Sequence, residues 1–185
     1  MICTAQTSVV ELEQPNSSPV PGHGAGAWFV LHTRVHQEKL LADDLSAKRI
    51  AHFLPLVRRV RYMGRRKTVV ETPLFPGYLF LRGSIEEAYS ADRSRRVAQI
   101  LTVVDQARMD WELRNIGLAL TNQATLDPYP YLRKGIRVEV RSGPLRGLQG
   151  IVEDRTKLNR LVLQVDILGQ ATSLELDGSL LDVLE

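Results

Sequence analysis

The chain has 185 residues, of which 44% are hydrophobic and 24% charged, a composition typical of one medium-sized or two small globular domains. A single cysteine, Cys3, excludes a disulfide framework and a cysteine-based metal site, and it indicates a reducing compartment. No segment approaches the ~20 apolar residues of a membrane span, and the first residues lack the basic and apolar regions of a secretory signal. We therefore expect a cytoplasmic protein that does not associate with membranes.

The net charge of +3 is unevenly distributed along the chain. Residues 1–26 carry two acidic and no basic side chains, residues 27–120 carry 16 basic and 10 acidic ones, and residues 121–185 carry 8 and 9. The three blocks therefore have net charges of −2, +6 and −1. A positive middle block indicates that this part of the chain faces a polyanion, whereas the last block does not.

Residues 1–26 are rich in Pro, Ser and Gly and have no periodic apolar pattern, which predicts a flexible tail. The next block, residues 27–120, alternates between strand-like and helix-like patterns. The predicted elements in chain order are a strand at 28–31, a helix at 35–49, a strand at 51–62 with a bulge or edge position at Pro55, a returning strand at 67–71, a strand at 77–82, a helix at 85–91, a strand at 97–104 and a helix at 108–120. This order predicts an α+β domain with helices packed on a mainly antiparallel sheet.

Residues 121–134 contain two X-Pro pairs, which favour extended backbone, and we expect a linker there. Beyond the linker, residues 135–185 show short alternating strands separated by glycines. The predicted strands are 136–140, 148–153, 160–167, 171–176 and 180–184. Five short strands in about 50 residues predict a small all-β barrel.

The most informative segment is Phe75-Pro76-Gly77-Tyr78, a rigid turn that leads into the apolar strand at 79–81. Alternating strand positions after the turn are typical of core packing. Phe75 and Tyr78 leave two interpretations open, since aromatic residues on a rigid turn serve either as core or as anchors for a binding partner.

Basic residues concentrate between positions 58 and 67, where six of ten side chains are Arg or Lys. Such a hairpin-like segment is either a solvated edge or a phosphate-binding element. The cluster Arg93, Arg95 and Arg96 allows the same two interpretations. The sequence shows no nucleotide-binding loop or catalytic constellation, and the His32 and His36 pair has no third ligand nearby, so we expect no enzyme activity, no cofactor and no metal.

From Trp28 onward the chain resembles the NusG family of transcription elongation factors. Four motifs carry the resemblance, in the family's order and spacing. They are Trp28-Phe29-Val30-Leu31, the helix start Gln37-Glu38-Lys39, the turn Phe75-Pro76-Gly77-Tyr78, and the glycine-spaced KOW segment 138–152 followed by residues 166–172. The resemblance implies an NGN domain at 27–120, an SH3-like KOW barrel at 135–185, and non-catalytic, monomeric binding to RNA polymerase.

Within that family, residues 65–76 look like RfaH-type specialised paralogues, whereas the barrel is similar to ordinary NusG and argues against helical refolding. We expect a specialised antitermination or elongation factor. The alternatives are a general NusG acting with Rho and the ribosome, and a ribosome-associated KOW protein.

The resemblance also implies three sets of binding residues. For the β′ clamp helices of RNA polymerase they are His32, Phe75, Pro76 and Tyr78. For DNA of the transcription bubble they are Arg34, His36 and Gln37, to which the basic cluster described above adds Arg95 and Arg96. For a small-subunit ribosomal protein or Rho they are Leu145, Ile167 and Leu168. Alternation with Val165 makes Ile167 a core candidate, which leaves Leu168 as the exposed one.

Overall fold

A computed structural model describes residues 26–63, 66–153 and 159–184. The predicted tail lies outside these residues apart from Gly26, and so does Arg65 of the basic segment. No helix in the described part of the chain has both the length and the apolar character needed to cross a membrane.

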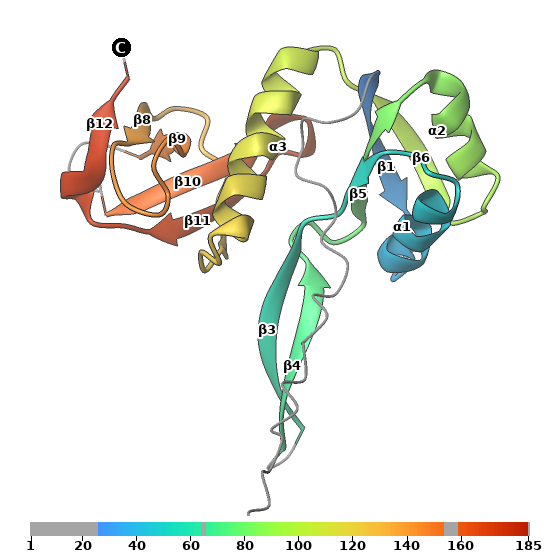
Figure 1. The fold of residues 1–185 in the computed structure, drawn as a ribbon, viewed down its shortest axis with the longest axis horizontal. Helices are drawn as coiled ribbons and strands as arrows, with labels where there is room; N and C mark the ends of the chain where they lie inside the picture. Colours follow the sequence, from blue (N-terminus) through green and yellow to red (C-terminus); the bar gives the residue numbers. More distant parts are fainter. Residues whose placement is uncertain (1–25, 64–65, 154–158, 185) are drawn as a thin grey trace, which may run out of the picture.

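A four-stranded sheet forms the centre of the N-terminal domain, with strand order β2-β5-β1-β6 and antiparallel pairing throughout (Figure 1). Its strands are β1 (Ala27–Thr33), β2 (His52–Phe53), β5 (Tyr78–Gly83) and β6 (Val97–Thr102). The predicted antiparallel sheet is therefore confirmed, although β6 ends two residues before the predicted boundary.

The two faces of this sheet are buried by different helices because side chains alternate along β1 and β5. Phe29, Leu31 and Leu79 pack with α1 (Glu38–Ala47) and α2 (Ile85–Asp92). Val30 and Phe80 point the other way and share a core with α3 (Gln106–Thr121). Helix α2 begins with a capping box, in which the side chains of Ser84 and Glu87 each accept a hydrogen bond from the backbone N–H of the other residue. These layers confirm the predicted α+β class.

Two further strands form a separate hairpin, β3 (Leu56–Met63) and β4 (Arg66–Pro73). The sequence predicted one strand with a bulge or edge position at Pro55, and the structure instead has two strands, β2 and β3, separated at this proline. Figure 1 shows the hairpin extending away from both globular parts of the molecule.

The C-terminal part is a six-stranded antiparallel sheet with the order β12-β8-β9-β10-β11-β7. Its strands are β7 (Asp127–Tyr129), β8 (Ile136–Val140), β9 (Gln149–Val152), β10 (Arg160–Val165), β11 (Gln170–Glu175) and β12 (Leu181–Val183). Short 3₁₀ helices, η1 (Asp166–Leu168) and η2 (Gly178–Leu180), precede β11 and β12. Strand β7 lies within the predicted linker and pairs with β11, so part of this segment belongs to the C-terminal sheet.

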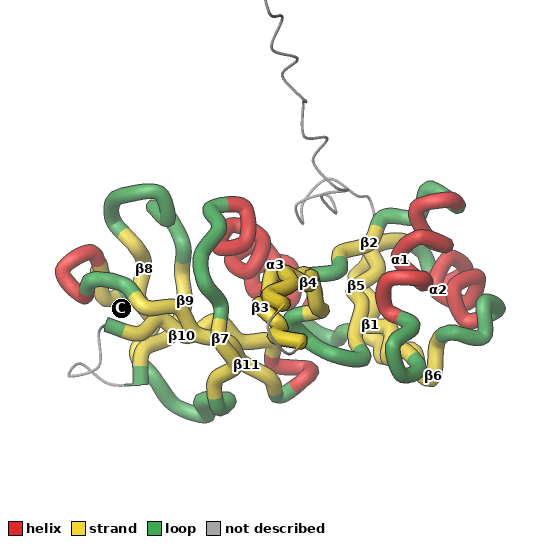
Figure 2. Tube along the Cα trace, turned by 90° about the horizontal axis from the view of Figure 1, so that it is seen from below, coloured by secondary structure: helices red, strands yellow, loops and turns green. Residues whose placement is uncertain are grey.

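Helix α3 lies between the two parts of the molecule (Figures 1 and 2). One continuous hydrophobic core joins Val30 and Phe80 of the N-terminal sheet, Leu113 and Ile116 of α3, and Leu163 of β10. The helix therefore packs on both domains at once.

Candidate functional site

The turn before β5 is held by backbone geometry that needs glycine. Gly77 has φ of +84°, a region that side chains with a Cβ rarely adopt, and its carbonyl accepts a 2.8 Å hydrogen bond from the N–H of Thr33. The N–H of Gly77 donates to the Glu38 Oε1 atom at 2.8 Å, and the N–H of Tyr78 donates to the Phe75 carbonyl at 3.2 Å. The turn is thus fastened to both β1 and α1.

Phe75 is a core residue in this structure, with only 1% of its surface exposed. Its ring meets Phe80 edge to face, with 6.2 Å between centroids and an interplanar angle of 89°. The turn rotates Phe75 inward because Gly77 reverses the chain directly after Pro76. The sequence had left open whether Phe75 is core or anchor, and the expectation that it contributes an exposed ring is wrong for this conformation.

The exposed part of the corner consists of His32, Pro76 and Tyr78. The rings of His32 and Tyr78 stack with centroids 5.0 Å apart and 23° between their planes, and both side chains are half-buried. Pro76 is exposed beside them. β1 pairs with β5 in a register that places His32 opposite Tyr78, which explains how residues 46 positions apart come together. The result is a small, rigid, partly apolar surface.

The predicted nucleic-acid residues gather around the start of α1. The backbone N–H of Arg34 donates to the Arg96 carbonyl at 2.7 Å, and the Arg96 guanidinium donates to the Gln37 side-chain carbonyl at 2.6 Å and to Asp44 at 2.8 Å. Arg96 is therefore brought next to Arg34 and Gln37, which are about 60 positions away in the sequence. These residues differ in how available their side chains are for binding a ligand, because Arg96 and Gln37 are hydrogen-bonded to each other.

The side chains of Arg34, His36 and Arg95 are exposed, and within the described part of the chain none of them forms an ion pair. His36 and Arg95 both have positive φ, of 58° and 60°, in the loops that flank the cluster. Arg34 and Arg95 are consequently the guanidinium groups free to meet a phosphate, and Arg96 positions the loop.

The C-terminal candidates are arranged differently from the prediction. Ile167 is 38% exposed, whereas Leu168 and Leu145 are half-buried against the core. The alternation argument was wrong here because strand β10 ends at Val165 and residues 166–168 turn into η1, so the period of two no longer applies. Ile167 lines a cleft of about 320 Å³ together with Val104, which precedes α3, and with Arg108 and Met109 near the start of that helix. Leu145 is not part of this lining.

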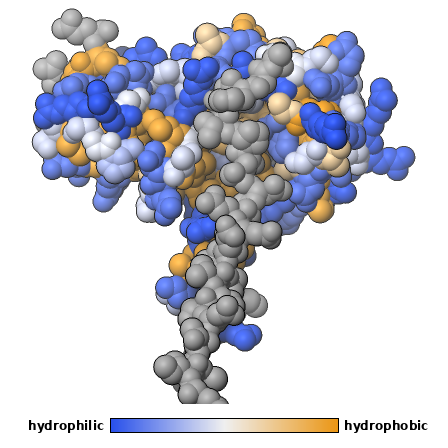
Figure 3. Space-filling model, in the orientation of Figure 1, coloured by the Kyte–Doolittle hydropathy of each residue, from blue (hydrophilic) through white to orange (hydrophobic). Residues whose placement is uncertain are grey.

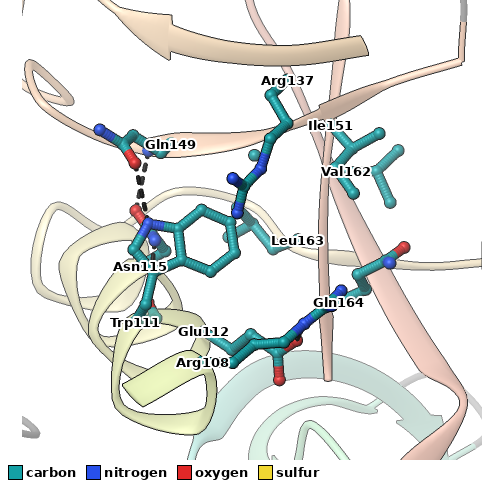
Figure 4. Close-up of a pocket in the computed structure, with 11 residues that line it drawn as sticks. Arg108, Trp111, Glu112, Asn115, Arg137, Gln149, Ile151, Val162, Leu163 and Gln164 are labelled. Carbon is teal, nitrogen blue, oxygen red and sulfur yellow. Dashed lines mark hydrogen bonds and ion pairs between the residues drawn. The ribbon is translucent and has the colours of Figure 1, made fainter. Parts of the chain in front are cut away.

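The contact between α3 and the C-terminal sheet was not expected from the sequence. The Trp111 indole Nε1–H donates to the Gln149 side-chain carbonyl at 2.8 Å, and the Gln149 backbone N–H donates to Asn115 Oδ1 at 2.8 Å (Figure 4). Arg137 lies over the Trp111 ring, 5.0 Å from its centroid. Only the assembled fold shows that the polar groups of Trp111 and Asn115 pair with another domain.

The contact between α3 and the C-terminal sheet also includes a cluster of charged residues. Glu112, 3% exposed, accepts from the Arg108 Nε–H at 3.1 Å and from the Asp166 backbone N–H at 3.2 Å. Arg108 also forms an ion pair with the Asp166 carboxylate, to which the Tyr131 hydroxyl donates at 2.9 Å. Burial and, after it, the Asp166 charge raise the pKa of Glu112 to about 7, although Arg108 acts in the opposite direction.

A cavity between α3 and the sheet is lined by Arg108, Trp111 and Gln149 among others, and it measures only about 20 Å³. This is room for about one water molecule. The contact is therefore a packed domain interface and is too small for a small-molecule ligand. No group of three or more potential metal-ligating side chains occurs among the residues that the structure describes.

The chain was compared with protein families, with curated proteins and with solved structures. The family model described as transcription termination factor nusG matches residues 26–112. The transcription termination/antitermination protein NusG of Thermus thermophilus is 32% identical over 177 residues, covering 82% of this chain and 95% of that protein. The protein of the same description from Rickettsia typhi is 28% identical over 182 residues, covering 88% and 92%. A chain from a crystal structure of the MjSpt4:Spt5 complex in conformation A aligns with a TM-score of 0.24 and 16% identity, covering 85% of this chain and 98% of that one.

Proposed function

The chain belongs to the NusG family of transcription termination and antitermination proteins, and from this premise we propose that its N-terminal domain binds RNA polymerase while its C-terminal domain recruits a protein partner. The protein is a non-catalytic transcription factor. Its site of action would be the cytoplasm, as a monomer.

The observation that carries the polymerase contact is the stacked pair His32 and Tyr78 beside exposed Pro76. A ring that is already fixed by stacking and by a pinned turn loses little conformational freedom on binding, so it contributes more to affinity. We assign these three residues to the β′ clamp helices, with Phe75 supporting the surface from below.

Replacement of the exposed ring tests this assignment. Tyr78→Ala is expected to lower polymerase affinity by about 2 kcal/mol, the usual size of an aromatic hot spot. Tyr89→Ala is the matched control, because Tyr89 is 57% exposed on α2, away from the corner. Both variants are titrated against core RNA polymerase. Equal affinity of the Tyr78 variant and the wild type would remove the corner from the proposed interface.

A second contact, with DNA of the transcription bubble, is proposed for Arg34, His36 and Arg95, supported from behind by Gln37 and Arg96. The amides at the start of α1 add a weakly positive end to this cluster. In assembled elongation complexes, Arg34→Ala should reduce the salt slope of binding by about one unit. Exposed Arg133 on the other domain supplies the control substitution. A slope that stays at the wild-type value would place the DNA contact elsewhere.

For the C-terminal domain we propose a small-subunit ribosomal protein or Rho as the partner. Leu145, Ile167 and Leu168 remain the proposed contact residues, with Ile167 now the most exposed of them. The slightly negative charge of residues 121–185 suits a protein partner better than a nucleic acid.

Two modes of action remain as candidates. Residues 65–76 favour a specialised antitermination factor, whereas the β-structured C-terminal domain and the 28–32% identity to NusG proteins over most of the chain favour a general factor. A reconstituted transcription assay on a Rho-dependent terminator separates them. A specialised factor should increase read-through, and a general factor should increase Rho-dependent release.

A further inference from the structure

The β3–β4 hairpin is a two-stranded ribbon whose two faces have different chemistry. Its strands pair over eight residues, from Leu56 opposite Pro73 to Met63 opposite Arg66, and neither strand pairs with a third one in the described part of the chain. Directly opposite residues share a face, and so do residues two apart on one strand. The register therefore assigns every described side chain of the ribbon to a face.

One face carries Arg59, Arg61 and Arg66. Arg59 lies opposite Val70 and Arg61 lies opposite Thr68, while Arg66 is paired with the position two residues after Arg61. All three arginines are exposed. No acidic residue occupies a described position of this face, which we call the arginine face.

The opposite face is mixed. Arg58 forms an ion pair with Glu71 at 3.4 Å, and the apolar pair Val60 and Val69 separates them from Tyr62. Among the residues that the structure describes, Arg59, Arg61 and Arg66 have no such carboxylate partner. Three adjacent unpaired guanidinium groups on a projecting ribbon repel one another unless an anion lies between them. Figure 3 shows both hydrophilic and hydrophobic residues on the visible part of this projection.

We propose that the arginine face of the β3–β4 ribbon binds the backbone of double-stranded DNA, independently of polymerase and apart from the cluster at the start of α1. A free two-stranded ribbon has the width that the major groove of B-form DNA admits. Arg59 and Arg61 are about 6.7 Å apart along the strand, close to the rise of roughly two nucleotides of one DNA strand. Guanidinium groups also contact phosphate oxygens in a bidentate manner.

Two features favour duplex DNA over other nucleic acids. Proteins that hold single strands stack bases on aromatic side chains, and the exposed aromatic residue of the described ribbon, Tyr62, lies on the opposite face. Double-stranded RNA has a deep, narrow major groove that side chains do not enter. The arginine face therefore matches the B-form duplex best.

The test uses the full chain and a fluorescein-labelled 20-base-pair DNA duplex, with anisotropy measured between 50 and 200 mM salt and no polymerase present. The triple variant R59A/R61A/R66A should reduce the slope of log affinity against log salt by about 3, since each phosphate contact contributes about 0.9. A charge-matched triple variant, R133A/K134A/R146A, removes three exposed cations from the C-terminal domain. It should change the slope by less than one. Arg58→Ala, on the mixed face, should leave the slope at the wild-type value.

Three outcomes overturn the proposal. They are equal slope changes in the two triple variants, an affinity for a single strand or an RNA duplex equal to or greater than that for the DNA duplex, and no binding by the wild type at 50 mM salt. Circular dichroism of each variant is compared with the wild type. If R59A/R61A/R66A alters the spectrum, the lysine triple R59K/R61K/R66K replaces it, and it should bind with the wild-type salt slope. Because no polymerase is present, a result that overturns DNA binding by the arginine face does not bear on the proposed polymerase contact.

Discussion

The carboxylate of Glu38 accepts a 2.8 Å hydrogen bond from the backbone N–H of Gly77 and is itself only 7% exposed. This bond ties the first turn of α1 to the corner that presents Tyr78. The arginine cluster around Arg34 and the His32–Tyr78 stack are therefore parts of one rigid unit. If the arginine cluster binds DNA and the His32–Tyr78 stack binds polymerase, the protein fixes the position of the DNA relative to the polymerase.

The Glu38 bond yields a prediction for stability and binding. Glu38→Ala leaves the Gly77 N–H without its partner, which should lower the free energy of unfolding by about 1–3 kcal/mol. Polymerase affinity should fall as well because the corner loosens. Glu38→Gln keeps an acceptor oxygen and should recover most of the loss. Asp43→Ala, an exposed substitution on the same helix, is the control in urea unfolding. Identical midpoints for the Glu38→Ala and Asp43→Ala variants would contradict a structural role for the bond.

A second prediction concerns Phe75. Because the ring is buried against Phe80, Phe75→Ala should lower the free energy of unfolding by about 3–5 kcal/mol, the usual cost of truncating a buried Phe. Phe75→Leu should cost much less and should bind polymerase nearly as well as the wild type. If instead Phe75→Ala unfolds at the wild-type urea concentration but loses polymerase binding, the ring acts as an anchor after a rearrangement of the corner.

Local patterns predicted most of the fold because the relevant forces were local or periodic. The apolar runs of β1 and β5, the effect of Pro55 and the alternation along β8 and β10 are all legible in the sequence. The inward turn of Phe75 depends on how Gly77 is fastened to Thr33, which the sequence does not give. The same holds for the pairing of Trp111 with Gln149, since contacts 38 residues apart between polar groups leave no periodic signal.

A third prediction follows from the raised pKa of Glu112, which burial and the Asp166 charge move to about 7 from an ordinary value near 4.5. Between these two values the folded chain holds a proton that the unfolded chain has lost, so the free energy of unfolding should fall as pH rises through this window. The contribution is complete below pH 4.5 and lost above pH 7, and it amounts to roughly 3 kcal/mol at about 1.4 kcal/mol per pKa unit.

Unfolding midpoints measured from pH 4.5 to 7.5 test this dependence. Glu112→Gln cannot titrate and should flatten the curve, whereas Asp92→Asn, an exposed substitution at the end of α2, should leave it unchanged. A Glu112→Gln curve with the wild-type slope would mean that another group titrates in this range.

The last prediction concerns where the C-terminal domain begins. A fragment of residues 131–185 matches the barrel expected from the sequence but lacks β7, and so removes the pairing with β11 and the 2.8 Å bond from the buried Thr172 hydroxyl to the Asp127 carbonyl. A fragment of residues 123–185 retains both. We expect each to give an all-β circular dichroism spectrum, with the longer fragment unfolding at a higher urea concentration.

The difference should amount to at least 1–2 kcal/mol, because an orphaned buried hydroxyl and an uncovered sheet edge each destabilise the short fragment. The substitution Thr172→Val removes the hydroxyl without changing the shape, and it should narrow the gap between the two fragments. A mainly helical spectrum for the longer fragment would overturn the assignment of a stable β domain. Equal stability of the two fragments would show instead that β7 contributes nothing to the domain and that residues 121–134 act as a plain connection.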